Sequence, residues 1–243
     1  ERKKIPQWFL RITKYSDELL RSTDDLKGWP SRVKMMQKNW IGISKGVLIK
    51  FQIKNSKYNL EVYTTRVDTI FGVSFLAISP NHKILKDIES DEVQNFIKRC
   101  KTLKVSEETV SSIDKEGVDT GLIAINPINN QEVPIWVGNY VLSDYGTGCV
   151  MSVPAHDERD HEFSIKYKLP IKQVIENIDN SADDDKAYTG EGKLINSEKF
   201  NGLDSNSAKL EILDSLEKIN AGEPRTNYRL RDWGISRQRY WGC

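Results

Sequence analysis

The sequence has 243 residues, 38% of them hydrophobic, and a formal net charge of +1, which together indicate a globular chain. It contains no run of about 18 apolar residues and no apolar leader, so we expect neither a membrane span nor a signal peptide. Its cysteines, Cys100, Cys149 and Cys243, are too far apart for a disulfide framework or a cysteine-pair metal site, which favours an intracellular, cytoplasmic setting.

The first 45 residues predict a small packed segment of one strand and two helices. Residues 7–13 have the pattern of a strand, and residues 15–26 have the spacing of an amphipathic helix whose leucines, including Leu26, face inward. Ser31 is expected to cap the second helix. The segment is too short to form a domain by itself.

A β-hairpin is predicted next, because hydrophobic residues alternate over residues 47–53 and again over 60–64, with a polar turn between them. The second strand ends in the run Thr64-Thr65-Arg66-Val67-Asp68-Thr69. Taken singly, each threonine is most simply a strand residue. Together, the run places two hydroxyls, a guanidinium and a carboxylate in one loop.

The middle of the chain alternates further strands with helices, which predicts a mixed α/β fold. Strands are expected over residues 73–78, 121–125, 133–141 and 171–175, and helices over 93–103 and 206–219. Ser79 and Pro80 are expected to begin another helix. The acidic segment 179–186 is expected to be a loop and not a metal site. The last helix should bury its apolar face, consisting of Leu210, Ile212, Leu213 and Leu216.

Residues 142–163 hold the densest group of chemically active side chains. A glycine turn leads into an apolar strand over residues 149–153, which a proline ends. Asp157 stands where a helix N-cap belongs, and Asp160 follows in the first turn, where a carboxylate favours the positive helix end. The ionisable groups here exceed what a cap requires: His156, Asp157, Glu158, Arg159, Asp160 and His161. We therefore expect the floor of an active site, although a strand, a turn and a capped helix also occur without chemistry.

Two other functions fit parts of this pattern. Residues four apart share a helix face, so one set could ligate a metal and make the protein a metal-dependent hydrolase: His156, Asp157, Asp160 and His161. Alternatively, the arginines and aromatic residues of 225–239 could serve a catalytically silent RNA-binding module. No serine stands in a GxSxG elbow, and Cys149 lies in an apolar strand, so the sequence offers no evident activated nucleophile.

Three stretches closely resemble the editing insertion (connective polypeptide 1) of bacterial-type leucyl-tRNA synthetases: NWIGISKG at 39–46, YTTRVDT at 63–69 and YGTGCVMSVPAHDERD at 145–160. Residues 227–242 resemble the point where that insertion rejoins the catalytic domain. The resemblance therefore covers essentially the whole chain.

Parts of these motifs are shared with isoleucyl and valyl enzymes, namely the Thr-Thr-Arg and Gly-Thr-Gly elements. Asp68-Thr69 and the run 151–157 look specific to the leucyl branch. The sequence departs from the family at Val67, where proline is usual, and at Ala155, where some members have glycine. Val67 removes a constraint on φ, which puts the rigidity of the threonine loop in question.

The resemblance implies a β-barrel-like core surrounded by helices, the fold of the class I editing domain. The expected division is a stalk and catalytic-domain remnant at 1–45, the editing domain at 46–226 and a return stalk at 227–243. Neither the HIGH nor the KMSKS signature of the ATP-binding catalytic domain occurs. We therefore expect an excised editing domain with its stalks, monomeric and without a cofactor. The implied partners are the 3′ end of tRNA(Leu) and the catalytic domain of the same synthetase.

The activity implied by the resemblance is hydrolysis of the ester that joins a wrong amino acid to the terminal adenosine of tRNA(Leu). Asp160 would bind the α-ammonium with Asp157 beside it, Thr64 and Thr65 would orient the ester or a water, and Arg66 would neutralise charge at the ester or order the loop. The other expected contacts to substrate are Asp68, Thr69, Leu142, Tyr145, Met151, Val153 and His156. A positioned water, assisted by the neighbouring ribose hydroxyl, would attack the ester directly.

A second pocket is useful because a synthetic site separates aliphatic side chains that differ by one methylene by only ~1–3 kcal/mol. The resemblance implies a pocket that admits norvaline, isoleucine or methionine and excludes leucine. Thr69 is similar to the family's residue for that exclusion.

Overall fold

The structure is a computed structural model that describes residues 6–102, 114–142, 147–177 and 186–235. The chain divides into two compact units, one made of residues 1–45 with 226–243 and the other of residues 46–225. In the described parts of the chain, no helix has both the length and the hydropathy needed to span a bilayer.

The first unit consists of a helix pair and a two-stranded sheet. Helix α1 (Ser16–Asp25) packs against α2 (Ser31–Ile41), and β1 (Phe9–Leu10) pairs antiparallel with β9 (Trp233–Gly234). Between β1 and α1, the 3-10 helix η1 (Ile12–Tyr15) is fixed by Thr13, whose backbone N–H and hydroxyl both donate to Asp232. Several large apolar side chains of this unit are exposed: Trp8, Met35, Met36 and Trp40.

Three sequence expectations for this unit are wrong. The strand expected over 7–13 is limited to β1, because the chain enters η1 at Ile12. Ser31 is the first residue of α2, and Pro30 holds the cap position. Leu26 follows the end of α1 and is exposed, while the residues that α1 buries are Ser16 and Thr23.

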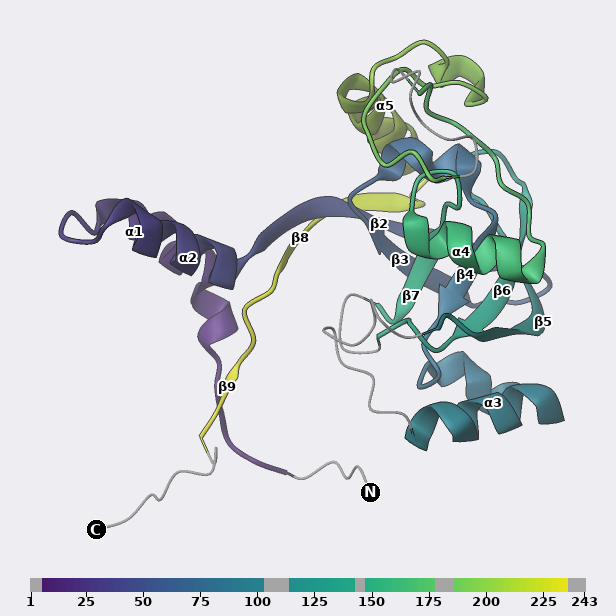
Figure 1. The fold of residues 1–243 in the computed structure, drawn as a ribbon, viewed down its shortest axis with the longest axis horizontal. Coiled ribbons are helices and arrows are strands. Elements are labelled where there is room, and N and C mark those ends of the chain that lie inside the picture. Colours follow the sequence, from purple (N-terminus) through teal and green to yellow (C-terminus); the bar gives the residue numbers. More distant parts are fainter. Residues whose placement is uncertain (1–5, 103–113, 143–146, 178–185, 236–243) are drawn as a thin grey trace. The chain divides into compact units, whose positions relative to one another are not determined.

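The second unit is built on a seven-stranded sheet in the order β3-β2-β5-β6-β4-β7, with β8 paired to β2. Its strands are β2 (Ile43–Ile53), β3 (Asn59–Thr64), β4 (Phe75–Ile78), β5 (Gly117–Ile125), β6 (Glu132–Gly138), β7 (Cys149–Ser152) and β8 (Gly222–Tyr228). β4 and β6 run parallel, and the other pairs along the path are antiparallel. The two ends of the path, β3 and β7, contact each other, so the sheet curls on itself (Figure 1). The expected barrel-like α/β core is confirmed.

The predicted hairpin is confirmed as β2 and β3. Val47 pairs with Thr64 and Phe51 with Leu60, so the alternating apolar residues of both strands face one core. The turn contains Asn55 at a φ of 60°, a left-handed conformation that asparagine tolerates. Gly46 lies so close to the end of β3 that a Cβ there would stand 2.3 Å from the Thr64 carbonyl oxygen. The hairpin therefore requires glycine at this position to bring Thr64 to its place.

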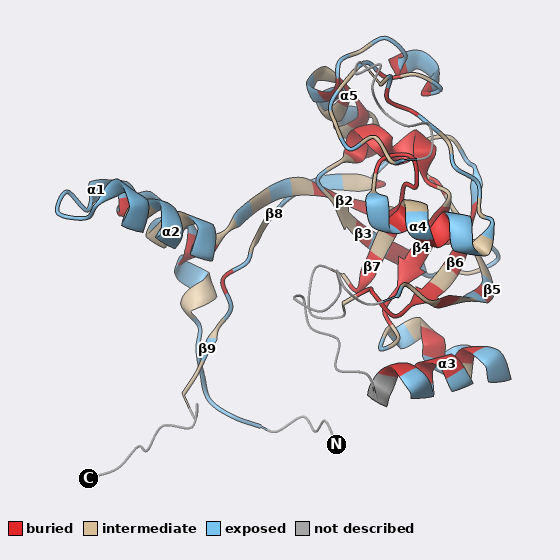
Figure 2. Cartoon of the chain, in the orientation of Figure 1, coloured by how far each residue is buried: buried red, intermediate tan, exposed pale blue. Residues whose placement is uncertain are grey.

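Helices cover the sheet on several sides, and their inward faces are buried (Figure 2). α3 (Asp91–Thr102) packs against β5, and α5 (Ser205–Lys218) packs against the 3-10 helix η2 (Val67–Gly72). α4 (Glu158–Tyr167) is fixed by an aromatic cluster in which Phe163 stacks on Phe75 of β4 and meets Trp136 of β6 edge-on. The remaining 3-10 helices are η3 (Lys83–Asp87) and η4 (Glu198–Phe200).

Residues 171–175 do not form the expected strand, although Val174 and Ile175 are buried. Their backbone N–H groups donate to the Nε2 atom of His156 and not to a neighbouring strand. Only Ile175 forms a bridge, with Leu194. Hydrophobicity was therefore a correct guide to burial here and a wrong guide to strand formation.

Other expectations are corrected at the ends of elements. Ser79 and Pro80 do not begin a helix, since a turn follows them and His82 caps η3. In α5, Leu210 is exposed and Ala208 is buried in its place. Most of the acidic segment 179–186 lies outside the described residues.

Candidate active site

The threonine loop begins where β3 ends. The hydroxyl oxygen of Thr64 accepts a hydrogen bond from the backbone N–H of Arg66 (3.0 Å), which tightens the turn into η2. Thr65 is exposed, whereas every residue of η2 is buried. The loop thus presents one exposed and one half-buried threonine above a buried floor.

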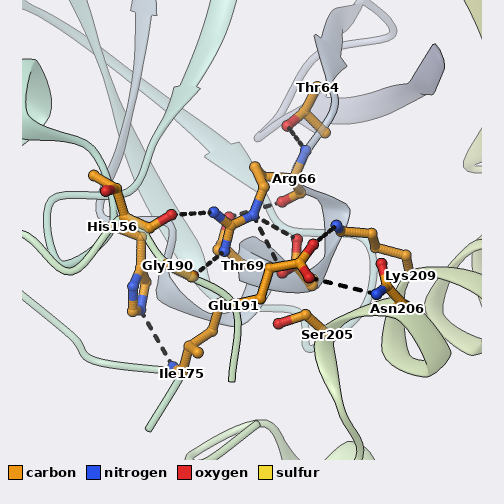
Figure 3. Close-up of polar contacts among 12 residues, drawn as sticks. Thr64, Arg66, Thr69, His156, Ile175, Gly190, Glu191, Ser205, Asn206 and Lys209 are labelled. Atoms are coloured by element: carbon orange, nitrogen blue, oxygen red, sulfur yellow. Dashed lines mark hydrogen bonds and ion pairs between the residues drawn. The ribbon is translucent and has the colours of Figure 1, made fainter. Parts of the chain in front are cut away.

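All three guanidinium nitrogens of Arg66 donate hydrogen bonds to other groups of the protein (Figure 3). Its Nε donates to both carboxylate oxygens of Asp68 (3.1 and 3.2 Å), and its Nη atoms donate to the carbonyl oxygens of Thr189 (3.0 Å) and Gly190 (3.2 Å). Asp68 has no exposed surface, so this pair neutralises a buried charge. Of the two roles expected for Arg66, charge neutralisation at the ester and ordering of the loop, these bonds perform the second.

Thr69 is also completely buried. Its hydroxyl donates to the carbonyl oxygen of Arg66 (2.7 Å), which fixes the side-chain rotamer. The expected contact between Thr69 and a substrate side chain stays a prediction.

The segment 188–192, which is distant in the sequence, contacts the threonine loop through Arg66. The Tyr188 N–H donates to the Ala155 carbonyl. Glu191 is paired with Lys209 of α5 (3.0 Å) and accepts from Asn206 (3.4 Å), as Figure 3 shows. Nothing in the sequence indicated this partner for the threonine loop, because Arg66 and Gly190 are 124 residues apart.

His156 is used structurally through both ring nitrogens. Nδ1 donates to the Tyr188 carbonyl (2.9 Å), while Nε2 accepts from the N–H groups of Val174 (3.0 Å) and Ile175 (3.3 Å). This pattern requires the neutral tautomer with its proton on Nδ1. Burial, followed by the positive charge of Arg66, lowers the pKa of His156 and keeps the ring neutral.

The metal-site alternative is not supported by this arrangement. Neither nitrogen of His156 is available to a metal, and Nδ1 of His161 lies 3.0 Å from the Pro154 carbonyl. Within the described ranges, no group of three or more His, Cys, Asp or Glu side chains could hold an ion.

Asp157 caps α4, as the sequence indicated. One carboxylate oxygen accepts from the N–H groups of Arg159 (2.9 Å) and Asp160 (3.3 Å), and the other pairs with the Arg159 guanidinium (2.9 Å). Burial opposes ionisation of Asp157, but these bonds outweigh it and lower the pKa of the carboxyl group. Asp157 is therefore charged at neutral pH.

Asp160 is more deeply buried than Asp157, and only 6% of its surface is exposed. Its Oδ2 accepts from the N–H of Val153 (2.8 Å), which ties the end of β7 to the first turn of α4. Burial, and then the negative charge of Asp157, raise the pKa of Asp160 to about 7. The two carboxylates thus differ in charge state near neutrality.

The raised pKa of Asp160 predicts how stability depends on pH. Between about pH 4 and pH 7 the native state keeps a proton that the unfolded state has lost, so the free energy of unfolding falls as pH rises through this window. Asp160→Asn keeps an acceptor for Val153 and removes the titration. We expect the variant to lose this part of the pH dependence and, at pH ~8, to be more stable by up to a few kcal/mol.

Urea unfolding of both chains at several pH values measures this difference. A wild-type chain whose stability is flat or rises across the window, with the variant following it, would place the Asp160 pKa near its ordinary value.

The other residues expected at the site are more dispersed. Met151 and Val153 are buried in the main core, and the Val153 carbonyl already accepts from the N–H groups of His156 and Asp157. Leu142 packs at the edge of the aromatic cluster. Tyr145 lies outside the described residues. Cys149 is fully buried, and burial raises its pKa, so it is not a nucleophile and a hydrolytic reaction here needs an activated water.

Comparison with known proteins gives a consistent result. The family model described as "Leucyl-tRNA synthetase, editing domain" matches residues 38–217. Leucine–tRNA ligases of Coxiella burnetii (strain Dugway 5J108-111) and Marinobacter nauticus are 52% and 51% identical to the chain over its full length. The chain spans only 30% and 29% of these two relatives.

A solved structure is similar in three dimensions as well. It is the ternary complex of Agrobacterium radiobacter K84 agnB2 LeuRS-tRNA-LeuAMS, with a TM-score of 0.78 and 37% sequence identity. The match covers 99% of this chain and 27% of that one.

Proposed function

This chain belongs to the family of leucyl-tRNA synthetase editing domains, and from that membership we propose that it hydrolyses the aminoacyl ester of mischarged tRNA(Leu). The observation that carries the proposal is the buried carboxyl group of Asp160, which lacks an ion-pair partner in the described part of the chain. It makes no ion pair with any described residue, and Arg159, on the same helix, pairs with Asp157 instead. A buried carboxylate of this kind gains most from a cation brought by the substrate. The α-ammonium of an aminoacyl ester is such a cation.

The threonine loop supplies the other half of the proposed site. Thr65 is exposed and Thr64 is half-buried, so their hydroxyls can orient the ester or the attacking water. Arg66 and Asp68 hold this loop against the segment 188–192, which gives a fixed geometry without a metal. The rate would come from positioning and from charge placement, with the neighbouring ribose hydroxyl assisting the water.

The proposed substrates are tRNA(Leu) esters of norvaline, isoleucine or methionine, whose terminal adenosine would bind near Leu142 and Tyr145. The exposed apolar residues of the first unit, Trp8 and Trp40 among them, would contact the catalytic domain of a cytoplasmic, monomeric synthetase. The similar solved structure is a complex of LeuRS with tRNA, which supports tRNA as the partner.

The direct test is deacylation of norvalyl-tRNA(Leu) without ATP by the synthetase that carries this chain. We expect hydrolysis well above the spontaneous rate, and the same rate after EDTA treatment, because both ring nitrogens of His156 are occupied by protein bonds. Binding without hydrolysis would identify a catalytically silent tRNA-binding module. Loss of activity with EDTA that zinc or manganese restores would identify a metal-dependent hydrolase.

A further inference from the structure

Among the described residues of the second unit, four buried side-chain atoms make no hydrogen bond of acceptable geometry: Nε1 of Trp136, Oη of Tyr140, Oγ of Ser152 and Oγ of Ser164. A buried hydroxyl that lacks a partner costs about 1–3 kcal/mol, so native proteins rarely keep one without a reason. Two of the four, Tyr140 and Ser152, interact electrostatically with Asp160.

The two residues come from different elements, and each lies next to a residue that contacts Asp160 or shares its helix. Ser152 is the last residue of β7 and directly precedes Val153, whose N–H donates to Asp160. Tyr140 follows β6, and its ring packs on Phe163 with centroids 5.5 Å apart. Phe163 stands one turn beyond Asp160 on α4. Tyr140 and Ser152 are themselves buried.

Electrostatics shows the same proximity. Burial and then the charge of Asp160 raise the pKa of Tyr140 well above its ordinary value, so the phenol stays protonated and remains a donor. The Ser152 hydroxyl favours the ionised form of Asp160 and of Tyr140, because it lowers both pKa values. The charged groups that act on Asp160 are Asp157 and Arg159 on its own helix.

We propose that Tyr140 and Ser152 are positioning residues for Asp160, whose hydroxyls donate to its carboxylate, directly or through one buried water, and keep it ionised for the substrate ammonium. This inference rests on the proposed function. An ionised carboxylate has about four acceptor positions, and the Val153 N–H fills one of them. A protonated Asp160 needs fewer donors, which is consistent with unused hydroxyls near it.

The test is the pH profile of norvalyl-tRNA(Leu) deacylation for Ser152→Ala, Tyr140→Phe and the double variant in the full enzyme. A hydrogen bond to a charged group is worth enough to move a pKa by about one unit, so the acidic limb should shift upward by about one pH unit in each single variant. The rate at the alkaline plateau should not change. The double variant should shift by less than the sum, because both hydroxyls act on one carboxylate.

Ser164→Ala is the matched control. It removes a hydroxyl that is equally buried and unpartnered, from the same helix as Asp160, and Ser164 is not among the main groups that shift the Asp160 pKa. Its profile should match the wild type. Each substitution removes one buried hydroxyl oxygen and leaves the rest of the side chain in place, so folding should be preserved.

The proposal would be overturned if the acidic limb of the pH profile did not shift in the Ser152 and Tyr140 variants, or if their deacylation rate fell equally at all pH values. Urea unfolding of this chain reports the same ionisation without any substrate. The pH window in which stability falls should end at a higher pH in both variants. If the wild type hydrolyses nothing, the proposed function fails, and this unfolding window still decides the role of the two hydroxyls.

Discussion

Asp160→Asn in the full enzyme should lower kcat/KM for deacylation of norvalyl-tRNA(Leu) by about 100-fold or more. Removing one partner of a buried charge pair costs about 2–5 kcal/mol, and a factor of ten in rate corresponds to about 1.4 kcal/mol. Asparagine keeps the shape of aspartate and can still accept from the Val153 N–H. The loss would therefore reflect the missing charge and not a displaced helix.

The matched control is Asp157→Asn, which removes a charge three residues away. Asparagine is a good N-cap, and the Asp157 charge is already paired with Arg159, so a much smaller loss is expected. The Asp160 assignment is wrong if Asp160→Asn deacylates as fast as the wild type, or if both variants lose the same activity.

Thr69→Ala should turn correctly charged leucyl-tRNA(Leu) into a substrate. The side chain lies in the buried floor formed by η2, next to the loop that carries Thr64 and Thr65. Alanine removes two heavy atoms there and so opens room for a branched side chain. Removing a repulsive element relaxes specificity, and the gain in transition-state binding for leucine should be on the order of 1–3 kcal/mol, or about 5–150-fold.

Thr69→Val separates the volume of the side chain from its hydrogen bond. Valine keeps the shape and loses the hydroxyl that donates to the Arg66 carbonyl. Leucyl-tRNA should therefore stay protected in Thr69→Val. If leucyl-tRNA is protected in Thr69→Ala while norvalyl-tRNA is still cleaved, the excluding wall lies elsewhere. If both variants cleave it, the hydrogen bond and not the volume controls specificity.

Local signals in the sequence predicted much of this site. Alternation gave the hairpin that carries Thr64, and the sequence around Asp157 gave the N-cap of α4, because each depends on residues close in the chain. The barrel-like closure came from family resemblance and not from any periodicity. It depends on β3 meeting β7, which no local pattern encodes.

Long-range partners explain most of what the sequence did not predict. His156 was expected to contact a substrate and Arg66 to neutralise charge or order the loop, and the structure joins both to the segment 188–190. His156 also accepts hydrogen bonds from the N–H groups of Val174 and Ile175, which would pair with a neighbouring strand if residues 171–175 formed one. Tyr140 has no pattern that marks it, since its importance arises only from the packing of Phe163 on it.

The contact between Asp160 and the substrate ammonium is tested most directly by a cycle of two enzymes and two esters. Wild type and Asp160→Asn are each assayed with norvalyl-tRNA(Leu) and with its N-acetylated form, which lacks the positive charge. We predict that the wild type prefers the free ammonium ester by about 100-fold and that Asp160→Asn cleaves the two esters at similar rates. An unchanged preference in Asp160→Asn would contradict the assignment and show that another group reads the ammonium.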